Sequence, residues 1–225
     1  MRQILRRTEE VRIGSTPVQL GGSLTLPPQA GGIVLFAHGS GSSRFSPRNQ
    51  FVAGRLQKAG LATLLMDLLT EEEEQEDLYT AAMRFNIPLL TERVLLALDW
   101  VRSGVRTRKM RAGCFGSSTG AASALEAAAA RPKEILAVVS RGGRPDLAME
   151  SLPRVVAPTL LIVGGADDVV IGMNQQAYRK LRCERKMEVI PGATHLFEEP
   201  GALEKVADLA AAWFQKHLAV GGSEG

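Results

Sequence analysis

Short, unbroken apolar runs that alternate with helical patterns constrain the fold of this chain most strongly. The first run is GIVLFAHG, from Gly32 to Gly39. Continuous hydrophobicity over so few residues is typical of a strand that is buried on both faces of a sheet. Five similar runs follow it along the chain: Leu61 to Leu68, Lys109 to Gly116, Ile135 to Gly143, Pro158 to Gly165 and Arg185 to Gly192.

Helical patterns separate these predicted strands. In the last of them, apolar residues from Leu203 to Phe214 recur at helical spacing and form one stripe. Strands that alternate with helices indicate βαβ units, and therefore a mostly parallel sheet that is covered by helices on both faces. The predicted helices are Arg48 to Ala59, Leu89 to Val101, Thr119 to Ala130, Asn174 to Leu181 and Ala202 to Leu218.

The start of the chain has a different pattern. Residues from Gln3 to Leu26 alternate between apolar and polar around two glycine-containing turns, which predicts an antiparallel strand pair. We find no internal linker or repeat in the 225 residues. We therefore expect one α/β domain over residues 1–219, followed by a flexible tail over residues 220–225.

Composition and charge narrow the possible functions. The formal net charge is +3, from 27 scattered basic and 24 acidic residues, so a nucleic-acid partner is not expected. The N-terminal residues lack the apolar core of a signal peptide, and no apolar run is long enough to span a membrane. Cys114 and Cys183 form neither a disulfide framework nor a metal-ligand pattern. We expect a cytoplasmic monomer or weak homodimer without metal or cofactor, and with no membrane partner.

A G-x-S-x-G motif spans Gly116 to Gly120, between a predicted strand and a predicted helix. This context is typical of a nucleophile elbow, where a strained turn lifts a serine hydroxyl above the sheet. Ser118 is then the candidate nucleophile, and Ser117 fills the turn. The alternative is an ordinary tight turn with polar residues.

A serine nucleophile needs a base and an acid that orients the base. Of the three histidines, only His195 lies in a loop between the last predicted strand and the last helix. Asp167 and Asp168 directly follow the strand before it. We expect Asp167 to be the acid, with Asp168 as the alternative; either could instead cap the following helix. The order serine, aspartate, histidine is that of α/β-hydrolases.

Two backbone amides are candidates for an oxyanion hole. One is that of Thr119, next to the nucleophile, and the other is that of Ser40, in the small-residue loop HGSGSS. Such a loop could instead cradle a phosphate, but the lysine of a phosphate-binding G-x-x-x-x-G-K-[ST] motif is absent from it.

The segments HGSGSSRFSPRN, GCFGSSTGAA, SRGGRPDLA, PTLLIVGGADD and PGATHLFEEPG resemble the dienelactone-hydrolase-like group of the α/β-hydrolase superfamily. The resemblance covers nearly the whole chain and implies the α/β-hydrolase fold. It also implies a triad of Ser118, Asp167 and His195, with oxyanion donors at Ser40 and Thr119. Dienelactone hydrolases use a cysteine where this chain has Ser118, which favours a generic ester. Some members are joined to a phosphoribosyltransferase domain, whose phosphate loop is absent here.

The segment between the predicted strand at Leu61 to Leu68 and the predicted helix at Leu89 is long for a structureless loop. Thr70 followed by Glu73 is a capping-box pattern, so we expect a short helix here and no large cap domain. This segment, residues 70–88, could offer an apolar wall to a shallow pocket, and three arginines near the same edge could attract an anionic substrate; surface or core roles are the alternative for all of them. The candidates are Leu78, Tyr79, Met83 and Phe85 for the wall, and Arg44, Arg141 and Arg144 for the substrate.

These patterns predict a serine hydrolase that cleaves carboxylic esters or lactones, with a small-molecule substrate. Two alternatives stay open. One is a non-catalytic protein that binds a small ligand in the same pocket, and the other is an acyltransferase.

Overall fold

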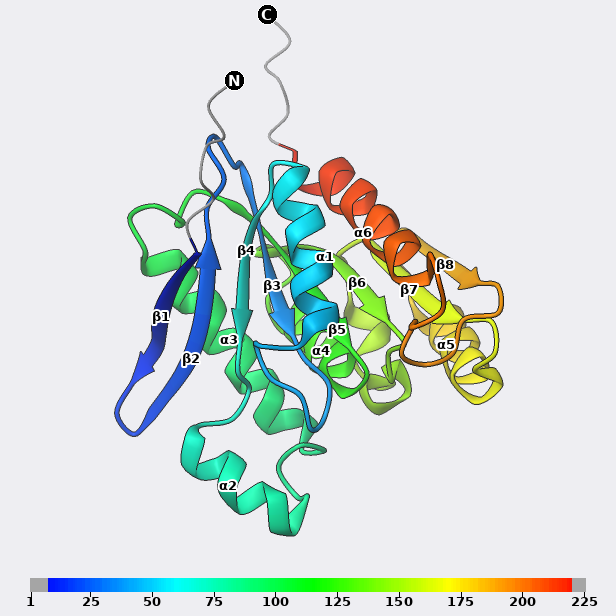
Figure 1. The fold of residues 1–225 in the computed structure, drawn as a ribbon, viewed down its shortest axis with the longest axis horizontal. Coiled ribbons are helices and arrows are strands. Elements are labelled where there is room, and N and C mark those ends of the chain that lie inside the picture. The colour runs from blue at the N-terminus through cyan, green and yellow to red at the C-terminus, as the bar shows by residue number, and fades with distance from the viewer. Residues whose placement is uncertain (1–7, 220–225) are drawn as a thin grey trace, which may run out of the picture.

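A computed structural model describes residues 8–219, and the tail expected over residues 220–225 lies outside this range. Strands and helices follow the predicted alternation (Figure 1). The strands are β1 (Thr8–Ser15), β2 (Val18–Thr25), β3 (Gly32–Ala37), β4 (Ala62–Met66), β5 (Arg111–Ser117), β6 (Ile135–Arg141), β7 (Thr159–Gly164) and β8 (Arg185–Ile190). The helices are α1 (Pro47–Lys58), α2 (Glu71–Thr80), α3 (Ile87–Ser103), α4 (Thr119–Ala130), α5 (Asp168–Lys180) and α6 (Ala202–Leu218).

The eight strands form one sheet in the order β1-β2-β4-β3-β5-β6-β7-β8. β1 pairs antiparallel with β2, and β2 antiparallel with β4, while β4, β3 and β5 to β8 are parallel neighbours. The antiparallel N-terminal pair and the mostly parallel sheet are therefore confirmed. Parallel strands bring their carboxyl ends to one edge, where the loops after β3, β5, β6, β7 and β8 meet.

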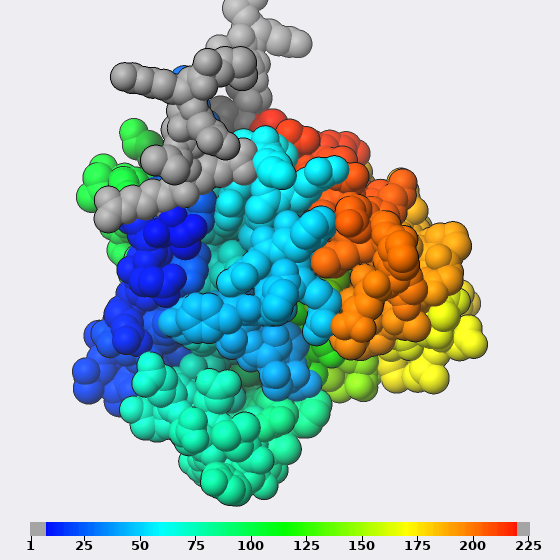
Figure 2. Space-filling view, in the orientation of Figure 1, coloured from blue at the N-terminus to red at the C-terminus, as the bar shows by residue number. Residues whose placement is uncertain are grey.

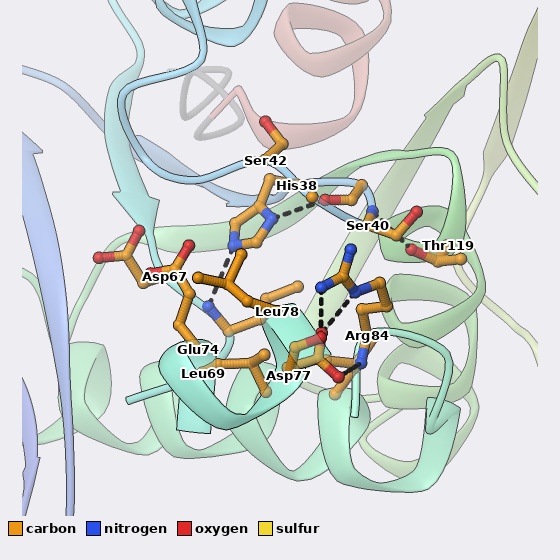
Figure 3. A pocket seen from close by; sticks show the side chains of 14 residues that line it. His38, Ser40, Ser42, Asp67, Leu69, Glu74, Asp77, Leu78, Arg84 and Thr119 are labelled. Atoms are coloured by element: carbon orange, nitrogen blue, oxygen red, sulfur yellow. Dashed lines mark hydrogen bonds and ion pairs between the residues drawn. The ribbon is translucent and has the colours of Figure 1, made fainter. Parts of the chain in front are cut away.

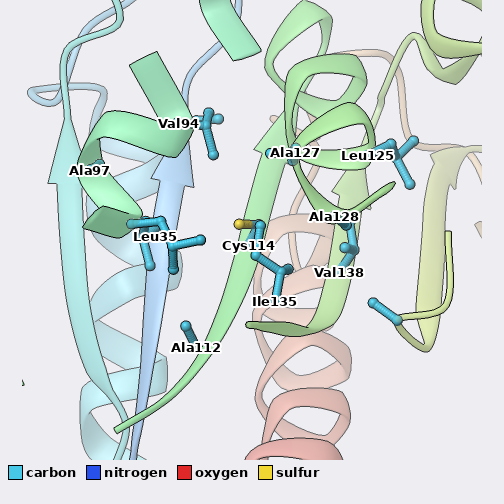
Figure 4. Packing of buried hydrophobic residues seen from close by; sticks show 14 of the residues in the cluster. Leu35, Val94, Ala97, Ala112, Cys114, Leu125, Ala127, Ala128, Ile135 and Val138 are labelled. Carbon is cyan, nitrogen blue, oxygen red and sulfur yellow. The ribbon is translucent and has the colours of Figure 1, made fainter. Parts of the chain in front are cut away.

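Helices cover both faces of the sheet, and each face has its own core. α1 and α6 lie on the front face in Figure 1, and α3 and α4 lie behind the sheet. The core between the sheet and α3 and α4 contains Leu35, Val94, Cys114, Leu125 and Val138 (Figure 4). The other contains Phe36, Phe115 and Phe214. Successive strand residues supply opposite cores because their side chains alternate between the two faces.

The helix predicted from Asn174 begins six residues earlier, at Asp168, so this predicted boundary is wrong. Residues 169–172 are Val-Val-Ile-Gly, all of low intrinsic helix propensity, which is why the pattern did not indicate a helix there. Tertiary contacts compensate for this low helix propensity. Val170 is buried, and the Asn174 side chain donates hydrogen bonds to the carbonyl oxygens of Gly143 and Val170, at 3.0 and 2.8 Å.

The short helix predicted between β4 and α3 is present as α2. The Thr70 hydroxyl accepts a hydrogen bond from the Glu73 amide at 3.2 Å, and the Glu73 carboxylate accepts one from the Thr70 amide at 2.8 Å. Glu73 also pairs with Arg93 of α3 at 2.6 Å, so it anchors α2 as well as capping it. Figure 2 shows α2 as a projecting lobe beside the loop that follows β3. Within residues 8–219, no larger insertion covers the carboxyl edge of the sheet.

Candidate active site

Ser118 connects β5 directly to α4. Its backbone has φ 49° and ψ −123°, a conformation that residues with a side chain rarely adopt. Ser118 occupies the N-cap position of α4, yet its side chain makes no capping hydrogen bond, although serine is among the preferred capping residues. The hydroxyl is therefore held at the tip of a strained turn and is not used to stabilise the helix.

The glycines on either side make this turn possible. A Cβ on Gly116 would overlap the backbone of Ala121, and one on Gly120 would overlap the carbonyl oxygens of Ala37 and His38. A Cβ on Gly39 would lie 2.9 Å from the Ser118 Cβ. Strand β3, the elbow and α4 thus approach one another more closely than larger residues would allow.

Asp167 and His195 are joined by a hydrogen bond from Nδ1 of the imidazole to Oδ2 of the carboxylate, at 2.8 Å. Because an ionised carboxylate can only accept, Nδ1 is the donor of this bond, and Nε2 is the ring nitrogen that Asp167 does not engage. The two loops are held together by a hydrogen bond from the Ala166 amide to the Ala193 carbonyl at 2.9 Å. They are neighbours because β7 and β8 pair in parallel, with Gly164 opposite Ile190.

The structure distinguishes Asp167 from Asp168. Asp167 stands at the N-cap position of α5 without making a side-chain capping bond, because its carboxylate faces His195 instead. Its side chain is 18% exposed. Asp168 is the first residue of α5 and is exposed. Of the two aspartates considered from the sequence, Asp167 is therefore the one whose carboxylate is hydrogen-bonded to the histidine, while Asp168 adds a negative charge to the helix N-terminus.

β6 lies between β5 and β7, and its end links the elbow to the histidine loop. The Ser118 amide donates to the Arg141 carbonyl at 3.4 Å. A Cβ on the next residue, Gly142, would lie 3.5 Å from Cε1 of His195. The hydroxyl of Ser118 and Nε2 of His195 make no hydrogen bond to each other. The structure thus brings the three expected residues to one edge of the sheet and joins two of them.

The two expected oxyanion donors also lie at this edge. The Ser40 amide donates to the Thr119 hydroxyl at 3.0 Å, so the Thr119 side chain holds the loop after β3 against the elbow. The Thr119 amide is at the first position of α4, where backbone amides have no intrahelical partner and the helix dipole favours negative charge.

His38, which sequence reasoning excluded as the catalytic base, has a structural role that it did not identify. Its Nδ1 bonds to the Gly39 carbonyl at 2.9 Å, and its Nε2 accepts from the Leu68 amide at 3.1 Å. Burial lowers the pKa of His38 below its ordinary 6.5, so the ring is neutral. It ties the loop after β3 to the loop after β4. The sequence feature that could have indicated this role is the position of His38 at the end of a buried strand, before Gly39.

A pocket borders these donors, between the loop after β3 and helix α2 (Figure 3). Asp77 and Arg84 close its lower side through a hydrogen-bonded ion pair, and Asp77 also accepts from the Met83 amide at 2.7 Å. Sequence reasoning missed Glu74, which lies one helical turn before Leu78 and so shares its face. The lining residues include Ser40, Thr119, His38, Leu68, Leu69, Glu74, Asp77, Leu78, Arg84 and Leu90.

Of the expected apolar wall, Leu78 lines this pocket. Tyr79 is 90% exposed and Phe85 56% exposed. Neither they nor Met83, which lies in the turn after α2, are among its lining residues, so these three do not form a wall of this pocket. α2 contributes Glu74, Asp77 and Leu78 to the pocket and leaves Tyr79 exposed, while Met83 and Phe85 follow the end of the helix at Thr80.

The three expected arginines occupy different surroundings. Arg44 forms an ion pair with Asp67 and a second one with Glu10 at 3.4 Å, and Arg144 pairs with Asp146 at 2.8 Å, so both charges are compensated. Arg141 is buried, and the Nε and Nη1 atoms of its side chain have no hydrogen-bonding partner. None of the three lines the pocket beside the oxyanion donors.

No helix within residues 8–219 is both long and apolar enough to cross a membrane. No group of three or more histidine, cysteine, aspartate or glutamate side chains in that part of the chain could hold a metal ion.

The order of the strands, the elbow after β5 and the loops after β7 and β8 define a protein of the α/β-hydrolase fold. Est1E from Butyrivibrio proteoclasticus shares this fold, with a TM-score of 0.75 at 16% identity over 92% of this chain and 98% of that one. The profile of the Dienelactone hydrolase family matches residues 20–219, and the chain belongs to that family. A crystal structure of a dienelactone hydrolase from Anabaena variabilis is 55% identical, with a TM-score of 0.93 over 95% of this chain and 99% of that one.

Two relatives from Mycobacterium tuberculosis are 53% identical over 219 residues, or 97% of this chain. Both are provisionally named phosphoribosyl transferases. The chain spans only 48% of their length, about half, so their names describe proteins with as much sequence again outside the matching part.

Proposed function

We propose that the chain is a serine hydrolase that cleaves carboxylic esters or lactones through an acyl-enzyme on Ser118. The observation that carries the proposal is the 2.8 Å hydrogen bond between Asp167 and His195, formed beside a serine in a strained elbow. Serine and aspartate both occupy helix N-caps and neither caps its helix. A purely structural turn would have no reason to keep both side chains from capping their helices.

In the first half of the proposed reaction, His195 acts as the base. Its Nε2 removes the proton from the Ser118 hydroxyl while the oxygen attacks the carbonyl carbon of the ester. Asp167 keeps the proton on Nδ1 and stabilises the imidazolium that forms. The proposed reaction requires Nε2 to come within hydrogen-bonding reach of the hydroxyl, and catalytic hydrogen bonds often tighten only when substrate is bound.

The tetrahedral oxyanion would receive hydrogen bonds from the amides of Thr119 and Ser40. A charged oxygen is a stronger acceptor than the neutral Thr119 hydroxyl, so it can compete for the Ser40 amide. The imidazolium then protonates the leaving alcohol. Water, deprotonated by His195, attacks the acyl group and releases the acid and Ser118. A lactone follows the same course, except that its alcohol stays attached to the acyl group.

The family relationship supports this reaction class. The Anabaena relative is a dienelactone hydrolase, and a dienelactone is a cyclic ester. The pocket beside the oxyanion donors presents Leu68, Leu69, Leu78 and Leu90 together with the carboxylate of Glu74. A carboxylate that faces the pocket disfavours an anionic group there, so we expect neutral acyl or alcohol groups to occupy it.

A fluorophosphonate probe tests the proposal, because it reacts covalently with an activated serine. Wild type should be labelled and hydrolyse short aryl esters, and Ser118→Ala should do neither. Ser117→Ala, one residue away, is the matched control and should behave as wild type. Equal labelling of wild type and Ser118→Ala would reject the proposal, and tight ligand binding without acylation would favour a binding protein. Product analysis with added alcohols distinguishes hydrolysis from acyl transfer.

A further inference from the structure

Arg141 is a buried cation without a compensating partner. Its side chain is only 7% exposed, and its Nε and Nη1 are buried with no hydrogen bond. Burial and the neighbouring charge of Arg48 lower the pKa of Arg141 to about 10, so the guanidinium is still protonated at neutral pH. A buried charge without a partner costs several kcal/mol or more, and such groups are rarely left unpaired in folded proteins.

The neighbouring charge that acts on Arg141 is that of a second cation, Arg48. Arg48 is the second residue of α1, in the first turn, where the helix dipole opposes a positive charge. Its Nη1 pairs with Glu198 at 3.1 Å, but its Nε is buried without a partner. Arg48 therefore contacts Glu198 while Arg141 lies over the ring of the preceding residue, Phe197, and together the two arginines have three buried nitrogens without a hydrogen-bond partner.

Nearby carboxylates do not compensate Arg141. Glu198 bonds to Arg48 alone, and no hydrogen bond or ion pair joins Arg141 to Glu198 or Glu199. The contact that the structure gives the Arg141 guanidinium is with the Phe197 ring, whose centroid is 6.0 Å from Cζ. A cation–π contact at this distance stabilises the guanidinium by less than the burial of its charge costs.

We propose that Arg141 and Arg48 form a binding site for a small oxyanion, either a free phosphate ion or a carboxylate group. An oxyanion presents several acceptors to the two guanidinium forks, which match it geometrically, and it would supply the missing negative charge. Because Arg141 is almost fully buried, the site admits only a small ion or the terminal group of a larger molecule.

The site lies directly behind the proposed catalytic residues. The carbonyl of Arg141 accepts the hydrogen bond from the Ser118 amide, and Gly142 contacts His195. Phe197, two residues after His195, has φ 57° and a fully buried ring. An ion bound between Arg48 and Arg141 would therefore brace the loop that carries His195, whether or not the chain hydrolyses esters.

Calorimetric titration of phosphate, and separately of acetate, in a low-salt zwitterionic buffer tests the site. Wild type should bind. Arg141→Met and Arg48→Gln should each weaken binding by about tenfold or more, equivalent to about 1.4 kcal/mol. Arg144→Gln is the matched control because its guanidinium is already paired with Asp146 at 2.8 Å, and it should bind as wild type. Ser118→Ala should also bind as wild type, which separates this result from that of the proposed hydrolysis.

Absence of binding to wild type, or equal binding to all variants, would overturn the proposal. If Arg141→Met does not fold, Arg48→Gln alone decides, because the Arg48 side chain is 33% exposed and tolerates the change more readily. Kinetics identify the source of the oxyanion. If it is a substrate carboxylate, phosphate should compete with an acid-bearing ester and not with its neutral methyl ester. If it is a free ion, phosphate should compete with neither ester.

Discussion

The backbone amide of Ser40 donates a hydrogen bond to the side-chain hydroxyl of Thr119 across 3.0 Å. Residues 79 positions apart are thereby joined at the point where β3 and β5 end side by side. The hydroxyl occupies the Ser40 amide until a stronger acceptor arrives, and it keeps that amide close to the elbow. Under the proposed function, the oxyanion donors are therefore positioned before substrate binds.

Replacement of Thr119 by valine should show how much this hydrogen bond contributes to stability and how much to catalysis. Valine keeps the shape and removes the acceptor, so we expect a loss of about 1 kcal/mol in the free energy of unfolding and a several-fold fall in kcat/KM. Urea unfolding measures the free energy of unfolding, and ester hydrolysis measures kcat/KM. Thr119→Ser keeps a hydroxyl and should match wild type in both. A valine variant with unchanged kcat/KM would show that the bond does not position the Ser40 amide for catalysis.

The two adjacent aspartates should differ sharply. Asp167→Asn removes the acceptor that holds the proton on Nδ1 of His195, and kcat should fall by roughly 10³ to 10⁴. Asp168→Asn removes an exposed charge at a helix N-terminus, which should cost about 0.3–1 kcal/mol of stability and little activity. Steady-state kinetics on one neutral ester compares them, and the opposite ranking would assign the acid to Asp168.

The sequence predicted the fold well because buried parallel strands are continuous apolar runs. Each run can be recognised from its own residues, without knowing which strand it pairs with. The elbow was predictable for a related reason. A motif between a strand and a helix places Ser118 on the chain, and the chain itself makes the turn. That Asp167 and His195 lie close together followed from their positions after the neighbouring parallel strands β7 and β8, whose carboxyl ends meet at one edge of the sheet.

Side-chain orientation in the segment between β4 and α3 was not predictable. Tyr79 and Leu78 are adjacent and both apolar, and only the packing of α2 decides that Leu78 lines the pocket. Arg44 and Arg141 look alike in the sequence, yet one is paired with Asp67 and the other has no partner. Such differences depend on contacts between distant segments, which no local pattern encodes.

Stability should depend on pH through His38. Burial lowers the pKa of His38 in the folded state, with partial opposition from its hydrogen bond to Gly39. Below about pH 6.5 the unfolded chain binds a proton at this residue that the folded chain does not, so acidification favours unfolding. The free energy of unfolding should be retained above pH 6.5 and fall below it, by up to about 1.4 kcal/mol per pH unit.

Urea unfolding between pH 7 and pH 5.5 measures this dependence. His38→Gln cannot be protonated, so its unfolding free energy should fall less over the same range, although it starts lower because the hydrogen bond from Leu68 is perturbed. The control is His217→Gln. Burial also lowers the pKa of His217, but Glu184 lies 3.7 Å away and opposes the shift, so this variant should change the slope less. Equal slopes for wild type and His38→Gln would contradict the prediction.

Two glycines in helices should respond in opposite directions to the same substitution. Gly54 is in α1, and a Cβ there would meet nothing within 4 Å. Gly54→Ala should therefore raise the free energy of unfolding by about 0.5–1 kcal/mol, the difference in helix propensity. Gly120 is in α4 among alanines, but its Cβ would overlap the carbonyl oxygens of Ala37 and His38.

Backbone atoms of a central strand cannot move aside as a flexible side chain can, so Gly120→Ala should lower the free energy of unfolding by about 3 kcal/mol or more. It should also displace the elbow and reduce fluorophosphonate labelling of Ser118, while Gly54→Ala leaves labelling unchanged. Urea unfolding and labelling of the two purified variants provide the comparison. If both substitutions stabilised the protein, β3 and α4 could not lie as close together as the structure has them, and the Ser40 amide would lose its position beside the nucleophile.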